Sequence, residues 1–141
     1  MRIVGLDVGE RRIGVAVSDP TRTLARPLGV LHARALDGDA PRVAAAEIKR
    51  LAGEDDGVSS IVVGLPAHLD GRPSTMTPRV RRFAEVLERL TDLPVTLQDE
   101  RLTSREAESR LAVREKDWRA RKARLDAAAA AIILQDYLDT L

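Results

Sequence analysis

Apolar residues recur along this chain with two periodicities, one typical of strands and one typical of helices. Two runs rich in β-branched residues, 3–8 and 13–17, flank a short turn at 9–11 that contains a glycine. This pattern predicts a β-hairpin, in which alternate side chains of the first strand lie on opposite faces. Shorter apolar runs predict three further strands, at 26–31, 60–65 and 93–97.

Helical spacing of apolar residues appears in the stretches between and after these strands. We predict helices after a start at 37–41, across 79–90, after a cap at Thr103 or Ser104, and across 125–138. The charged, poorly periodic segment 113–124 is predicted to be a loop or a frayed helix. The inward-facing positions expected on the second helix are Val80, Phe83, Ala84, Val86, Leu87 and Leu90. This order of elements predicts an α/β protein with a five-stranded mixed sheet and helices on its faces.

Size and composition narrow the class of protein. With 141 residues, 44% of them hydrophobic, and with no repeat or linker, the chain is expected to form a single domain over 1–141. No apolar run is long enough to cross a membrane, and Asp7 and Glu10 interrupt the place where a signal peptide would lie. Cysteine is absent, which excludes disulfides, thiolate zinc sites and cysteine nucleophiles. We therefore expect a soluble, cytoplasmic protein.

Three carboxylates stand at positions where packing alone does not require them. Asp7 lies within an apolar strand, Glu100 follows the end of the fifth strand, and Asp126 opens the last helix on its apolar face. Burying an unpaired carboxylate is costly, so each calls for a hydrogen-bond donor, a cation or a metal. Together they favour a cage for a divalent metal ion. The alanine run 127–131 supports this, because small side chains let a helix approach a sheet closely.

Each acid also has an ordinary structural explanation. Asp7 could bond the turn amides or Arg11, Glu100 could pair with Arg101, and Asp126 could be an N-terminal acid favoured by the helix macrodipole. Taken one at a time, these explanations are at least as good as a catalytic role. The metal cage therefore rests on the three acids together.

Several motifs resemble the YqgF/RuvX family along the full length of the chain and in the same order. They are the opening GLDVGERRIGVAVSD of Gly5–Asp19, Val63–Pro66 with Asp70–Gly71, Asp99–Ser104, and Asp126-x-x-Ala-Ala followed by Ile133–Gln135 and Tyr137–Leu138. The resemblance implies a ribonuclease H-like fold. It also implies a nuclease, described for that family as a Holliday-junction resolvase or a pre-16S rRNA nuclease.

By this resemblance Asp7, Glu100 and Asp126 would be the catalytic, metal-binding acids. Hard oxygen ligands fit Mg²⁺ or Mn²⁺, whereas two separated histidines, His32 and His68, are too few for a zinc site. Two such ions about 4 Å apart would activate water and stabilise the leaving oxygen. One departure from the family is visible in 112–124, which has no glycine turn.

Substrate contacts are expected from residues beside these acids. Arg11 and Arg12 could hold a phosphate, and His68 and Asp70 could line the groove, with Arg101 next to Glu100 as a further contact. Solvated turn charges and ordinary loop residues are equally good explanations. The expected partner is nucleic acid, either precursor rRNA or branched DNA, with no membrane and with a homodimer left open.

Two other classes of function compete with the nuclease. An actin-like or sugar-kinase nucleotide binder also begins with an Asp-x-Gly hairpin, but such proteins clasp the nucleotide between two domains. A catalytically silent nucleic-acid adaptor would not need all three acids.

Overall fold

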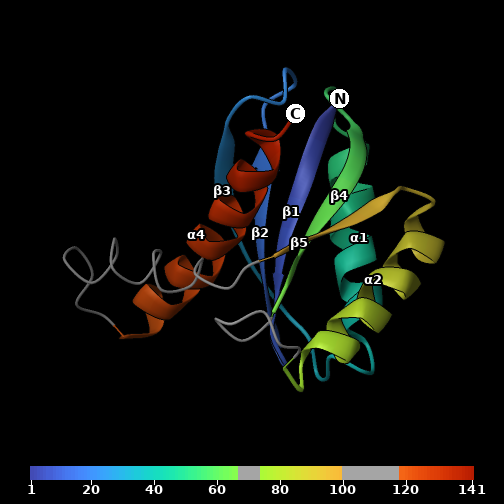
Figure 1. Ribbon diagram of the computed structural model, residues 1–141, viewed down its shortest axis with the longest axis vertical. Helices are drawn as coiled ribbons and strands as arrows, with labels where there is room; N and C mark the ends of the chain where they lie inside the picture. Colours follow the sequence, from blue (N-terminus) through green and yellow to red (C-terminus); the bar gives the residue numbers. More distant parts are fainter. Residues whose placement is uncertain (67–73, 100–117) are drawn as a thin grey trace.

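A computed structural model describes residues 1–66, 74–99 and 118–141, the last segment with its side chains from residue 124 onward (Figure 1). Its five-stranded sheet has the order β3-β2-β1-β4-β5. The strands are β1 (Arg2–Val8), β2 (Arg12–Ser18), β3 (Ala25–His32), β4 (Val58–Leu65) and β5 (Val95–Asp99). β1 pairs antiparallel with β2 and parallel with β4, and β4 pairs parallel with β5. The predicted mixed sheet is confirmed, including the hairpin and its turn at 9–11.

Three described helices cover the two faces of this sheet, as Figure 1 shows. They are α1 (Ala40–Ala52), α2 (Thr77–Thr91) and α4 (Trp118–Leu138). α1 and α2 lie on one face and α4 on the other. None of the helices in the described ranges is both long enough and apolar enough to span a membrane.

The predicted alternation along β1 decides which residues face which helix. Val4, Leu6 and Val8 belong to the large core under α1 and α2. Ile3 packs instead against α4 residues such as Ile133 and Leu134, in a second core. The face of β1 that carries Ile3, Gly5 and Asp7 is therefore the α4 face.

The start of β5 and the burial of Leu90 differ from the prediction. β5 begins at Val95 and not at residue 93, because Asp92 ends α2 in a left-handed conformation (φ 56°) and Pro94 has no N–H to donate to the sheet. Leu90, expected to face inward, is 37% exposed. It lies in the last turn of α2, at the margin of the face that buries Val80 and Leu87.

The last helix is longer than predicted. α4 begins at Trp118, inside the charged segment expected to be a loop or a frayed helix. The residues 118–124 are Trp, Arg, Ala, Arg, Lys, Ala and Arg, and most of these are strong helix formers despite their lack of apolar periodicity. Asp126 therefore stands within the helix and does not open it.

Candidate active site

Asp7 is a half-buried carboxylate near the carboxyl end of β1, on the face that α4 covers. Its cross-strand partner on β2 is Gly14. Because β1, β4 and β5 run parallel, their carboxyl ends meet at one edge of the sheet, which is where open α/β sheets place their sites. The prediction that Asp7 lies within the first strand is confirmed.

Asp126 reaches the same edge from α4. It lies about two helical turns after Trp118, so the charge of the helix N-terminus no longer acts on it strongly. The structural explanation of Asp126 as an N-terminal acid is therefore wrong.

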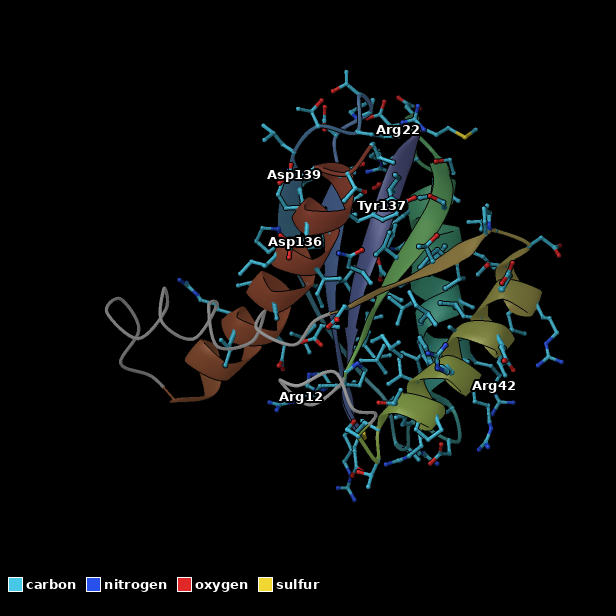
Figure 2. All side chains as sticks on the ribbon, in the orientation of Figure 1. Arg12, Arg22, Arg42, Asp136, Tyr137 and Asp139 are labelled. Carbon is cyan, nitrogen blue, oxygen red and sulfur yellow. The ribbon has the colours of Figure 1, made fainter. Side chains whose placement is uncertain are left out.

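One cavity of about 420 Å³ brings the two acids together. It is lined by Asp7, Asp126 and the hairpin turn with the strand residues on either side of it, Val8–Arg12. One carboxylate oxygen of Asp126, Oδ2, is buried and lies 3.4 Å from Nε of Arg12. Both side chains are partly exposed, Arg12 at 32% and Asp126 at 23%. Figure 2 shows Arg12 in the lower half of the view, well separated from Tyr137 and Asp139 near the upper end of α4.

Glu10, the third acid of this cavity, has a structural role. Its Oε1 lies 2.7 Å from Nη1 of Arg79 on α2, and Nη2 of Arg79 lies 2.8 Å from Asp37 before α1. Hydrogen bonds to Glu10 and then to Asp37 raise the pKa of the Arg79 guanidinium above its ordinary value. This arrangement ties the turn that carries Arg11 and Arg12 to the helices of the other layer.

The remaining predicted site residues lie outside the described parts of the chain. These are Glu100, His68, Asp70 and Arg101, together with the caps at Thr103 and Ser104. Asp99, the described residue before Glu100, ends β5 at the same edge of the sheet as Asp7. Within 1–66, 74–99 and 118–141, no group of three or more acidic, histidine or cysteine side chains is arranged to hold a metal ion.

The residues present nevertheless fit a divalent cation. Asp7 and Asp126 contribute hard carboxylate oxygens to one cavity, the donor type that Mg²⁺ and Mn²⁺ prefer. Arg12 already places a positive charge 3.4 Å from Asp126, so in this structure the carboxylate is balanced by a side-chain cation.

Sequence reasoning missed the residues that seat α4 on the sheet. Gly14 contacts the main chain of Asp126, and Gln135 bonds the turn before β3. A glycine inside an otherwise β-branched strand is itself a signal of close backbone approach. Gln135 carries no comparable signal, because its partners are main-chain atoms far away in the sequence.

Comparisons with known proteins identify the family of this chain. A family model described as RuvX, Holliday junction resolvase, matches residues 1–140. Two curated relatives are each named "Putative pre-16S rRNA nuclease". The one from Anaeromyxobacter sp. (strain Fw109-5) is 45% identical, over 99% of this chain and 97% of its own length. The one from Roseiflexus sp. (strain RS-1) is 42% identical, over 99% of this chain and 94% of its own length.

Solved structures show the same fold at much lower identity. RuvC from Thermus thermophilus matches with a TM-score of 0.57 and 16% identity, over 99% of this chain and 95% of that chain. The fowlpox virus Holliday junction resolvase matches with a TM-score of 0.56 and 15% identity, over 99% of both chains. The fold is therefore the predicted ribonuclease H-like fold.

The family match and the full-length relatives favour the nuclease over the nucleotide-binding and silent-adaptor alternatives. This chain belongs to the RuvX family, and as a member of that nuclease family it is an enzyme that hydrolyses phosphodiester bonds in nucleic acid.

Proposed function

We propose that this enzyme is a divalent-metal-dependent endonuclease that processes the 5′ end of precursor 16S rRNA. The observation that carries the proposal is the shared cavity of Asp7 and Asp126, two acids from opposite ends of the chain. The choice of substrate follows the names of the relatives that match at 45% and 42% identity over nearly their whole lengths. Action on precursor rRNA would take place in the cytoplasm.

In this proposal Asp7, Glu100 and Asp126 hold Mg²⁺ or Mn²⁺ at the carboxyl edge of the parallel strands. Bound there, the metal would supply the positive charge that activates water and stabilises the leaving oxygen. Asp7 is held in place by the strand ladder of β1, and Asp126 by the packing of α4 on the sheet. Asp7 and Asp126 therefore come from regular elements, as a site with fixed geometry requires.

Arg12 has two successive roles in this account. Before substrate binds, its guanidinium balances the charge of Asp126 at 3.4 Å. Because the group is 32% exposed at the mouth of the cavity, it can also reach a phosphate of the substrate strand. Arg11 lines the same cavity, and we assign it a neighbouring phosphate. His68, Asp70 and Arg101 complete the proposed substrate contacts.

A four-way DNA junction is the second candidate substrate, favoured by the description of the matching family model. Resolving a junction takes two symmetric cuts, which a two-fold dimer supplies. Trimming one RNA end takes a single cut and needs no dimer. The homodimer is thus part of the second candidate only.

A cleavage assay with mapped products tests the proposal. Precursor 16S rRNA with an extended 5′ end and a four-way DNA junction are offered separately, each with Mn²⁺, Mg²⁺ or EDTA. We expect metal-dependent cleavage at the mature 5′ end, near-complete loss in Asp7→Asn and Asp126→Asn, and normal rates in Asp136→Asn, an exposed acid on α4. Symmetric junction cuts by a dimer, with the RNA left intact, would establish the second candidate. Full activity in EDTA, or in either acid variant, would contradict both.

A further inference from the structure

The main chain of α4 rests directly on β2 at Gly14. A Cβ atom placed on Gly14 would lie 2.0 Å from the carbonyl oxygen of Asp126 and 2.5 Å from its carbonyl carbon. It would also lie 3.2 Å from the amide nitrogen of Ala127. Since all three atoms belong to the backbone, no change of rotamer can relieve the overlap. Any larger residue at position 14 would have to move the helix or the strand.

This contact joins Asp7 and Asp126, two of the acids that line the cavity. Gly14 is the cross-strand partner of Asp7, and it touches the backbone of Asp126. Gly14 therefore links Asp7 to Asp126. It pairs with Asp7 across two neighbouring strands, and it packs against the backbone of Asp126 in α4. In such an arrangement, displacement of α4 at Gly14 changes the separation of the two carboxylates directly.

The other glycine under α4 provides a comparison. A Cβ on Gly5 would lie 2.7 Å from Cβ of Leu134 and 3.1 Å from the carbonyl oxygen of Ala130. This contact also presses on α4, but it is one to two turns beyond Asp126. Gly29 on the edge strand β3 has open space where a Cβ would stand. Alanine at each glycine therefore probes a different effect. Gly14 tests the contact beside Asp126, Gly5 tests the general packing of α4, and Gly29 tests the effect of alanine on a strand alone.

We infer that Gly14 is a positioning residue that sets the distance between Asp7 and Asp126, and thereby the affinity of the site for its metal ion. This inference rests on the proposed function, because it takes the two acids as metal ligands. Bringing the Cβ of an alanine at position 14 from 2.0 Å to a tolerated 3.0 Å from the Asp126 carbonyl moves β2 and α4 apart by about 1 Å. A displacement of that size in a catalytic group costs about 10²-fold in rate.

Three alanine variants of the full chain test the inference: Gly14→Ala, Gly5→Ala and Gly29→Ala. Two quantities are measured for each, the rise in Tm caused by Mn²⁺ relative to EDTA, and the rate of RNA cleavage against Mn²⁺ concentration. We expect lower Tm values in EDTA for both Gly14→Ala and Gly5→Ala, because both press on α4. Only Gly14→Ala should lose most of the Mn²⁺-induced rise, and it should cleave about 10²-fold more slowly. Gly29→Ala should resemble the wild type.

A folded Gly14→Ala with the wild-type response to Mn²⁺ would overturn the inference, as would equal losses in Gly5→Ala. If Gly14→Ala does not fold, the same two measurements are made on Asp126→Glu. With α4 seated firmly on Gly14, the extra methylene cannot be absorbed, so Asp126→Glu should lose its Mn²⁺ response. A normal response in Asp126→Glu would contradict the inference. A wild type that neither binds Mn²⁺ nor cleaves would instead refute the proposed function.

Discussion

The carboxylate of Asp19 accepts several hydrogen bonds within the turn between β2 and β3. Its Oδ1 accepts hydrogen bonds from the N–H groups of Thr23 and Leu24, both at 2.8 Å, and its Oδ2 accepts from the hydroxyl and the N–H of Thr21. The hydroxyl bond from Thr21, followed by the backbone bonds from Leu24 and Thr23, holds the pKa of Asp19 well below its ordinary value. The ionised form is therefore the one that the fold prefers.

This preference predicts how Asp19→Asn depends on pH. A lowered pKa in the folded state gives stability that is fully present above the unfolded value of about 3.9 and is lost as pH falls toward the folded value. Asn keeps one acceptor but replaces the other with a donor, so the variant should melt at a lower temperature near pH 7. The difference in Tm should shrink steadily below about pH 4. Thermal melts of both proteins from neutral to acid pH measure it, and a difference that does not change with pH would contradict the assignment.

At the scale of whole elements, α4 is fastened to the sheet at two places, near its middle and near its last turn. Near the cavity its backbone rests on Gly14, and near its last turn Gln135 bonds the chain that leads into β3. Oε1 of Gln135 accepts from the N–H of Ala25 at 2.9 Å, and Nε2 donates to the carbonyl of Thr23 at 2.9 Å. Nε2 also donates to Asp139 at 2.9 Å. Two hydrogen bonds from the Gln135 side chain to main-chain atoms thus hold α4 against the edge of the sheet.

We predict that Gln135→Ala destabilises the protein by about 1–3 kcal/mol, because the partly buried N–H of Ala25 loses its acceptor. Asp139→Ala is the matched control, since it removes only the third bond of Gln135 and should have a much smaller effect. Urea unfolding of both variants gives the free energies. The cleavage rate of folded Gln135→Ala should stay near normal, because the residue lies far along α4 from Asp126. Equal destabilisation by the two variants would show that the main-chain bonds carry little stability.

The elements that sequence reasoning located well are those with a strong local period. The hairpin, the α4 face of β1 and the position of Asp7 follow from alternation at 3–8 and a glycine turn. The start of α4 was missed because 118–124 is charged and shows no apolar period. The start of β5 was missed because Asp92 and Pro94 act through backbone conformation. Such local effects are weak signals in a hydrophobicity pattern.

For the site, the resemblance to a family supplied what periodicity could not. Residue patterns alone left Asp7 and Asp126 with ordinary explanations, and only tertiary packing brings both into one cavity. The contacts of Gly14 and Gln135 join residues more than a hundred positions apart, so no local pattern reveals them. The ion pair of Arg12 with Asp126 belongs to the same class.

At the scale of the molecule, the cavity lies between the sheet and α4 and is lined by residues of both. Asp7 belongs to the central strand of the sheet and Asp126 to the helix that covers it (Figure 1). A metal ion held by both would therefore stabilise the whole fold, because it would bind the folded state and not the unfolded chain. Charge balance in the metal-free state is also shared between layers, since Arg12 of β2 faces Asp126 of α4.

Thermal melts of the wild type and Asp126→Asn, each in EDTA and in Mn²⁺, test the central claim most directly, with Asp136→Asn as a control on the same helix. In EDTA the variant loses repulsion from Asp7 but also the ion pair with Arg12, so the two proteins should lie within about 1 kcal/mol of each other. Mn²⁺ at 100 times its Kd should stabilise the wild type and Asp136→Asn by about 2.7 kcal/mol, and Asp126→Asn much less. If Mn²⁺ raises the Tm of Asp126→Asn as much as that of the wild type, Asp126 does not bind the metal and the account of the site is wrong.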